Sequence, residues 1–157
     1  MTATKVIGES VKQTNRTFIK SYVNDYANAI TENYRRYHIN TLNGNLHGNY
    51  PEYAREQLDA IENGTANLMK FKVYSGKRYY KIVQQEFETW EKSRNYGKYA
   101  DGSVHCFVDK ETGDVYKPAS WSAPAKHIRF SFQNEADLRF LLNPDNVGWA
   151  GGYLYIR

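Results

Sequence analysis

The stretch Lys70-Phe-Lys-Val-Tyr-Ser-Gly-Lys-Arg-Tyr-Tyr-Lys-Ile-Val-Gln-Gln-Glu-Phe87 decides the class of fold. Charged and apolar side chains alternate at its start, which is the two-residue period of a β-strand. Ser75-Gly76 then interrupts the pattern with a turn signal. We therefore predict two strands, over residues 70–74 and 78–87, that pair as a hairpin.

The sequence after this hairpin supplies more strands. Residues 104–108 and 115–117 are rich in β-formers, and Thr112-Gly113 between them is the turn of a second hairpin. Residues 92–102 are polar and predict a longer loop. The expected product is an antiparallel meander of three or four strands.

The C-terminal residues predict two short elements. Asn134 is placed to cap a brief helix that runs to Leu142, and residues 151–157 predict a terminal strand or a packed tail. Three tryptophans are candidates for large core or pocket-lining groups: Trp90, Trp121 and Trp149.

Before residue 68 the apolar period lengthens to three and four. The stripe from Phe18 to Tyr37 predicts a helix over residues 15–38, which Thr14 or Asn15 would cap. Residues 40–49 are rich in Asn and Gly and predict a loop.

Pro51 is suited to the first position of a second helix, which Asn63-Gly64 would end. Two helices on a short link predict an antiparallel hairpin. We expect an α+β fold in which this N-terminal helical hairpin packs on a small antiparallel β-sheet, with a short C-terminal helix and a terminal strand. Residues 1–157 form one domain, with a helical part at 1–67 and a sheet part at 68–157.

Composition narrows the class of protein. The chain has 157 residues, a net charge of +4 and no apolar run near the roughly 20 residues that cross a bilayer. Its first residues lack the apolar segment of a signal peptide, and a single cysteine excludes an internal disulfide. We expect a cytoplasmic protein with a mild preference for anionic partners and no membrane association.

Catalytic and metal-binding signatures are not evident in the sequence. Ser75-Gly76-Lys77 lacks the upstream glycine and the following Ser or Thr of a phosphate-binding loop. The four histidines are too scattered for the usual zinc or iron spacing. We predict no enzyme activity, no catalytic residue, no metal and no cofactor.

His105 and Cys106 are the pair closest to a nucleophile with its base. Neighbours on a strand point to opposite faces, so we expect that these side chains do not pair directly. Cys106 alternates with Val104 and Val108. This alternation predicts that Cys106 is a buried, structural residue.

The acidic residues of the sheet part have a solvated interpretation. Glu86 and Glu88 share one face of a strand, and we favour an exposed edge over paired-carboxylate chemistry because no partnering group is evident. Asp109, Glu111 and Asp114 are expected at the exposed tip of the second hairpin, where charges need no function.

The strongest functional signal is basic and aromatic. Residues 70–81 carry five basic side chains and no acid, and residues 115–134 again carry no acid. Ammonium groups hold phosphates and rings stack on bases, so the two segments predict one region that binds an anionic ligand. The alternative is that the rings pack the core while the lysines are only solvated. The predicted ligand-binding residues are Lys70, Lys72, Tyr74, Lys77, Arg78, Tyr80, Lys117, Trp121, Lys126 and Arg129.

Three motifs follow one another in the C-terminal half: Phe107-Val-Asp-Lys-Glu-Thr-Gly-Asp-Val-Tyr-Lys-Pro-Ala-Ser-Trp121, Ala123-Pro-Ala-Lys126 and Trp149-Ala-Gly-Gly-Tyr-Leu-Tyr-Ile-Arg157. In this order, together with residues 76–83, they resemble small uncharacterised accessory proteins of tailed bacteriophages. The resemblance implies a phage origin and action in the cytoplasm of the host cell. It transfers no functional residue.

Two functions are expected, ahead of a third interpretation, an enzyme of unrecognised type. The first is a non-enzymatic accessory protein whose basic and aromatic surface holds an anionic ligand, either a nucleotide that serves as an immune signal or single-stranded nucleic acid, in a counter-defence role. The alternative is an inhibitor of a host protein that acts through the Tyr-rich helical part, since Tyr is a common interface anchor. The same stripe suits a homo-oligomer.

Overall fold

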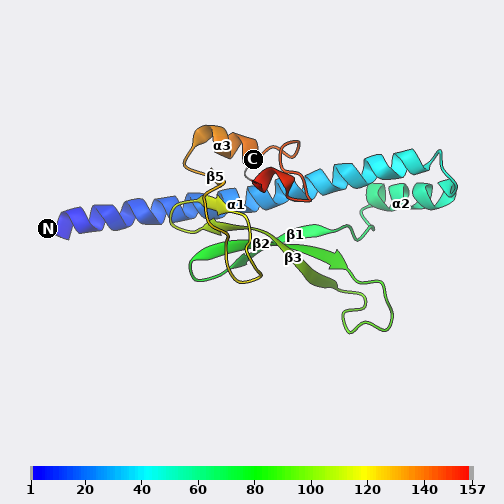
Figure 1. Cartoon of the computed structure of the whole chain (residues 1–157), viewed down its shortest axis with the longest axis horizontal. Coiled ribbons are helices and arrows are strands. Elements are labelled where there is room, and N and C mark those ends of the chain that lie inside the picture. Colours follow the sequence, from blue (N-terminus) through cyan, green and yellow to red (C-terminus); the bar gives the residue numbers. More distant parts are fainter. Residues whose placement is uncertain (1, 156–157) are drawn as a thin grey trace.

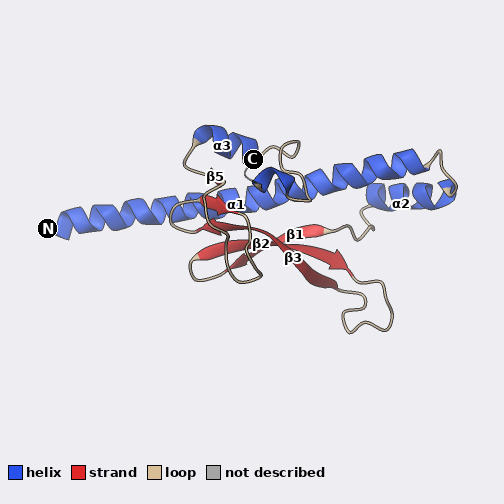
Figure 2. Cartoon of the chain, in the orientation of Figure 1, coloured by secondary structure: helices blue, strands red, loops and turns tan. Residues whose placement is uncertain are grey.

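The computed structural model describes the backbone of residues 2–155 and the side chains of residues 15–155. Five antiparallel strands form one sheet in the order β1-β2-β3-β4-β5, so the sheet is a simple meander (Figure 2). The strands are β1 Lys70–Ser75, β2 Tyr79–Phe87, β3 Tyr99–Asp109, β4 Asp114–Tyr116 and β5 Phe130–Ser131.

Helix α1 (Thr2–Asn45) lies across one face of the sheet, and α2 (Pro51–Asn63) runs back beside its C-terminal end (Figure 1). The predicted stripe faces the core, where Val23, Tyr26 and Ile30 are fully buried. They share one cluster with the sheet residues Ile82 and Val108. The α+β class is therefore confirmed, with the helices on an antiparallel sheet.

Helix α3 (Glu135–Leu141) and the 3-10 helix η1 (Gly152–Leu154) lie on the other side of α1 from β2 and β3 (Figure 1). Leu141 and Leu154 bury their side chains in the same core cluster. The C-terminal segment is thus a packed tail, and the predicted terminal strand is wrong for the described residues up to 155. Residues 156 and 157 lie outside the described part of the chain.

Helix α1 is longer than predicted at both ends. The predicted loop at 40–49 is wrong in its first half, because the helix continues to Asn45. Leu42 is 2% exposed in the part of α1 that α2 packs beside, so burial outweighs the weak helix propensity of the Asn and Gly residues. The predicted cap at Thr14 or Asn15 is also wrong, since both positions lie inside the helix.

Some helix ends and turns that depend on neighbouring residues agree better with the predictions from the sequence. Gly64 ends α2 with a φ of 75°, and Asn134 caps α3 by accepting the N–H of Asp137 at 3.0 Å. Gly113 takes a φ of 74° in the β3–β4 turn, where a Cβ would lie only 2.9 Å from the Cβ of Phe132. Only glycine meets both demands of this turn.

Two parts of the sheet differ from the prediction. Strand β3 begins at Tyr99, inside the predicted loop at 92–102, and the two-residue strand β5 was not predicted at all. Trp90 is 62% exposed in the loop between β2 and β3, so its predicted place in a core or pocket is wrong.

A bulge interrupts the pairing of β2 with β3. Ile82 pairs with Cys106 and Val83 with Val104, which leaves His105 without a partner on β2. A bulge of this kind breaks the strict alternation of faces along a strand. The His105 ring accordingly contacts the ring of Phe71, a member of the core cluster, at 5.2 Å between centroids.

Candidate ligand-binding site

A groove of about 360 Å³ lies between the β1–β2 turn and the loop that follows β4. We call it the Trp121 groove. Its main lining residues are Tyr74, Lys77, Arg78, Tyr79, Lys81 and Trp121. No Asp or Glu is among the described residues that line it, so the groove presents positive charge beside aromatic rings. Its volume is at the small end of the range of about 300–1,000 Å³ that is typical of ligand sites.

Trp121 is held over the sheet by a loop with internal order. The Ala125 N–H donates to the Lys117 carbonyl at 2.7 Å, and Pro118 and Pro124 form an isolated bridge. Trp121 lies at the tip of this loop. The ammonium of Lys81, on β2, lies 4.0 Å from the Trp121 ring centroid and donates to the Trp121 carbonyl at 3.0 Å. Trp121 is 46% exposed, so the part of its ring that Lys81 does not cover is available for stacking.

The β1–β2 turn contributes two cations that the fold leaves largely uncommitted. Lys77 makes no hydrogen bond, ion pair or ring contact with any residue that the structure describes. The Arg78 side chain is 74% exposed, and its Nε lies 3.6 Å from the Asp109 carboxylate. Its guanidinium carbon lies 5.2 Å from the Tyr79 ring centroid.

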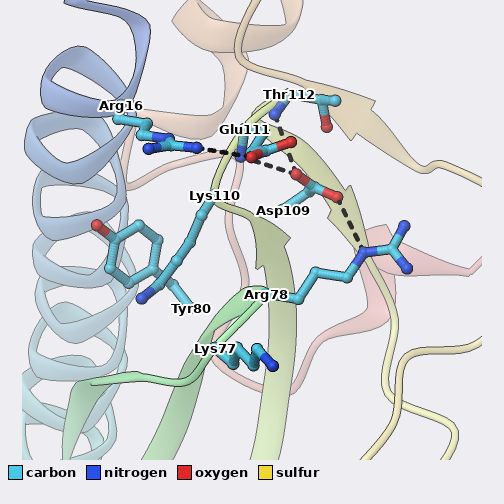
Figure 3. Close-up of a pocket in the computed structure, with 8 residues that line it drawn as sticks. All are labelled: Arg16, Lys77, Arg78, Tyr80, Asp109, Lys110, Glu111 and Thr112. Atoms are coloured by element: carbon cyan, nitrogen blue, oxygen red, sulfur yellow. Dashed lines mark hydrogen bonds and ion pairs between the residues drawn. The ribbon is translucent and has the colours of Figure 1, made fainter. Parts of the chain in front are cut away.

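A second cavity, of about 840 Å³, adjoins the same turn (Figure 3). We call it the Arg16 cavity. Lys77 and Arg78 line it as well, and Arg16, Lys110, Asp109 and Glu111 are among its other lining residues. Arg16 reaches from α1 to form an ion pair of 2.7 Å with Glu111.

Asp109 differs from the predicted exposed tip. It is 6% exposed, and one carboxylate oxygen accepts the N–H groups of Glu111 at 2.8 Å and Thr112 at 3.0 Å. Asp109 therefore holds the β3–β4 turn in shape, which corrects the prediction for this residue. Glu111 is exposed as predicted.

The structure brings four of the predicted ligand-binding residues together in the Trp121 groove: Tyr74, Lys77, Arg78 and Trp121. Lys70 and Lys72 share the face of β1 with Tyr74, but neither lines the groove. The Lys70 ammonium lies 4.0 Å from the Tyr99 ring centroid, and that of Lys72 lies 4.8 Å from the Tyr74 ring centroid.

The other four predicted residues lie elsewhere. Tyr80 follows Tyr79 on β2 and lines the Arg16 cavity. The Lys110 ammonium lies 4.9 Å from the Tyr80 ring centroid. Lys117 lies 4.7 Å from the Tyr155 ring centroid and lines a separate cavity of about 310 Å³. Lys126 is exposed on the loop before β5.

Arg129 has a structural task. Its guanidinium donates to the carbonyls of Leu154 at 2.7 Å, Lys126 at 2.7 Å and His127 at 2.6 Å. These bonds fasten η1 to the loop before β5. The two acid-free segments therefore meet only around the β1–β2 turn, where Trp121 lies beside Lys77 and Arg78.

His105 and Cys106 meet a buried chain of hydroxyl groups. His105 Nε2 lies 2.7 Å from the Tyr153 hydroxyl, which lies 2.5 Å from the Tyr26 hydroxyl, and the Tyr26 hydroxyl is hydrogen-bonded to Cys106. Among the described residues His105 and Cys106 are linked through Tyr153 and Tyr26 and not directly to each other, as expected. The expected reason, opposite faces of the strand, is wrong, because the bulge breaks the alternation there.

Burial sets the protonation of the network. Desolvation lowers the pKa of His105 to about 4, and a hydrogen bond to the Trp149 backbone opposes this only in part. Desolvation also raises the pKa of the Cys106 thiol to about 12, so the thiol stays neutral. The burial predicted for Cys106 is confirmed, at 0% exposure.

The described residues contain neither a metal-binding cluster nor a membrane-spanning helix. No group of three or more His, Cys, Asp or Glu side chains in this part of the chain is placed to hold a metal ion. Glu86 is exposed, while the Glu88 carboxylate accepts the N–H of Trp90 at 2.8 Å. None of the described helices has the length and apolar character needed to cross a bilayer.

Sequence reasoning missed the residues that reach the turn from a distance. Arg16 lies on α1, about sixty positions before the turn, and no local pattern connects the two. Lys110 stands among acids in the sequence. Its contacts in the structure place it at the β1–β2 turn, where its backbone N–H donates to the Arg78 carbonyl at 3.0 Å and its ammonium donates to the Ser75 hydroxyl at 2.5 Å.

Fold and site together define a small α+β protein with a basic and aromatic surface groove at one end of a five-stranded sheet. Residues 6–156 match the model of a family of unknown function (DUF7717), and the chain belongs to this family. Comparison with curated proteins and with solved structures finds no match.

Proposed function

We propose that the protein binds a nucleotide in the Trp121 groove, without catalysing a reaction. The base stacks on the exposed Trp121 ring, and Lys77 and Arg78 hold its phosphate. The observation that carries this proposal is the lining of the groove, which combines uncommitted cations and an exposed indole with no acidic side chain. Stacking platforms beside cations are the usual means of holding a base and its phosphate.

The other expected function, inhibition of a host protein through the Tyr-rich helix, has less support. The middle of the stripe is buried, with Val23, Tyr26 and Ile30 all at 0% exposure. These side chains pack on the sheet and are not free for a partner. We therefore place the ligand at the groove and not on α1.

The biological setting is part of the same proposal. Binding without turnover would lower the free concentration of a signal nucleotide, which is a counter-defence role for a phage accessory protein in the host cytoplasm. The resemblance of the C-terminal motifs to phage accessory proteins supports this setting. The groove supports only the class of ligand.

The test compares Trp121→Ala with Trp90→Ala. Both tryptophans are exposed on loops, but Trp90 lies at the opposite end of β2 from the β1–β2 turn (Figure 1). The probes are the four ribonucleoside triphosphates and the oligonucleotide dT12, titrated by calorimetry. Stacking on one ring is worth about 1–3 kcal/mol, so Trp121→Ala should weaken binding about 5- to 150-fold.

Trp90→Ala should bind like the wild type. Equal affinities of the two variants, or no binding of any probe, would contradict the proposal. The salt dependence tells strand from free nucleotide, because a single strand loses about 0.7 log unit of affinity per phosphate contact for each log unit of salt.

A further inference from the structure

The Arg16 cavity adjoins the Trp121 groove across a single turn. Lys77 and Arg78 line both, and the Lys110 ammonium of the Arg16 cavity bonds to Ser75, which lines the groove. A ligand that rests on these two cations therefore has a second cavity within reach.

The two cavities differ in what they offer. An ammonium lies over a ring in both, Lys81 at 4.0 Å from the Trp121 centroid and Lys110 at 4.9 Å from the Tyr80 centroid (Figure 3). Trp121 is 46% exposed and Tyr80 is half-buried, so the Arg16 cavity offers less ring surface to a base. It offers cations, which suit phosphate oxygens.

The two acids of the Arg16 cavity do not cancel its positive charge. Arg16, Lys77, Arg78 and Lys110 line it together with Asp109 and Glu111. One oxygen of Asp109 is already bonded to two backbone N–H groups. Glu111 is 65% exposed in its pair with Arg16, and such exposed pairs are weak, so an incoming phosphate can replace its carboxylate.

We infer that the Arg16 cavity is a phosphate subsite and that the ligand is a free nucleotide with a chain of phosphates. The phosphate next to the sugar lies on Lys77 and Arg78, and the terminal phosphates reach Lys110 and Arg16. This inference rests on the proposed function. The groove, at about 360 Å³, has one exposed indole and so one stacking platform, whereas proteins that bind a strand stack successive bases on several rings.

The experiment measures the affinities of the four ribonucleoside monophosphates, the four triphosphates and dT12. The variants are Arg16→Gln/Lys110→Gln and the control Lys92→Gln/Arg94→Gln, which removes the same charge from the exposed β2–β3 loop. The tightest triphosphate should bind at least about tenfold better than its monophosphate, and the first variant should remove this difference. The control should keep it.

A third variant tests whether a phosphate replaces the Glu111 carboxylate on Arg16. Glu111→Gln removes the carboxylate that occupies Arg16, so it should tighten triphosphate binding and leave monophosphate binding unchanged. Equal binding of mono- and triphosphates, a difference that survives Arg16→Gln/Lys110→Gln, or tighter binding of dT12 than of every nucleotide would overturn the inference while leaving the groove as a site. Failure of all probes to bind would overturn the proposed function itself.

Discussion

The sheet face that α1 covers and the β1–β2 turn use polar residues in opposite ways. On the face that α1 covers, Tyr26 and His105 are buried and Tyr153 is half-buried, and their polar groups are bonded to one another. At the β1–β2 turn, Lys77 and Arg78 stand in solvent beside aromatic rings with few contacts of their own. The first arrangement fixes the fold, and the second leaves its charges for a ligand.

The difference shows how polar groups divide between stability and binding. A buried group without a partner costs about 1–3 kcal/mol, so groups that face α1 must satisfy each other. Exposed charges contribute little to folding and are free to meet an anion. Changes in the buried network should therefore alter stability, and changes at the turn should alter binding.

The largest expected effect is a loss of stability in acid that comes from His105. Its pKa is about 4 in the folded protein and about 6.5 in the unfolded chain, because burial disfavours the charged ring. Between about pH 4 and pH 6.5 the His105 ring is therefore protonated in the unfolded chain and neutral in the folded protein. The free energy of unfolding should then fall as the pH drops from about 6.5 to about 4, by roughly 3 kcal/mol.

Urea unfolding at half-unit pH steps measures this slope, and His105→Gln should flatten it. The His105 ring signal, followed by NMR in the native protein, should not titrate above about pH 5. An imidazole that titrates near 6.5 would show that the network is open to water, and the contrast between the covered face of the sheet and the β1–β2 turn would be lost.

A smaller effect is expected at Cys106. Cys106→Ala removes a fully buried sulfur and one member of the network, which should cost about 1–2 kcal/mol and leave nucleotide binding unchanged. Native protein should react slowly with a thiol reagent, and protein unfolded in guanidinium should react at once. Fast labelling of the native protein would argue against the burial.

Local patterns predicted several of the turns and helix ends. The β1–β2 hairpin, the Gly113 turn and the Asn134 cap each follow from a few neighbouring residues. The end of α1 does not, because it depends on the burial of Leu42 beside α2. Nor does alternation along a strand reveal the bulge at His105, since a bulge depends on the partner strand.

The site was predictable only along one hairpin. Tyr74, Lys77 and Arg78 are close in sequence, so their shared location follows from the turn. Trp121 was predicted to lie with them because it belongs to the acid-free segment 115–134. Arg129 belongs to the same segment, but its guanidinium is bonded to backbone carbonyls. Composition cannot tell a cation that faces a ligand from one that holds a loop.

The smallest expected effect on stability comes from the turn. Lys77→Gln/Arg78→Gln removes exposed side chains whose only close charged partner among the described residues is Asp109, at 3.6 Å from Arg78. The free energy of unfolding should stay within about 0.5 kcal/mol of the wild type. A larger loss would mean that these cations hold the fold, as the buried network does.

The most direct test measures binding and unfolding of Lys77→Gln/Arg78→Gln beside Lys92→Gln/Arg94→Gln. Both variants lose the same charge from exposed positions, but only the first pair lines the groove. We predict that the first variant binds the tightest ribonucleotide at least about tenfold more weakly with an unchanged melting temperature, while the second binds like the wild type. Equal affinities of the two variants would contradict the assignment of the β1–β2 turn as the anion site.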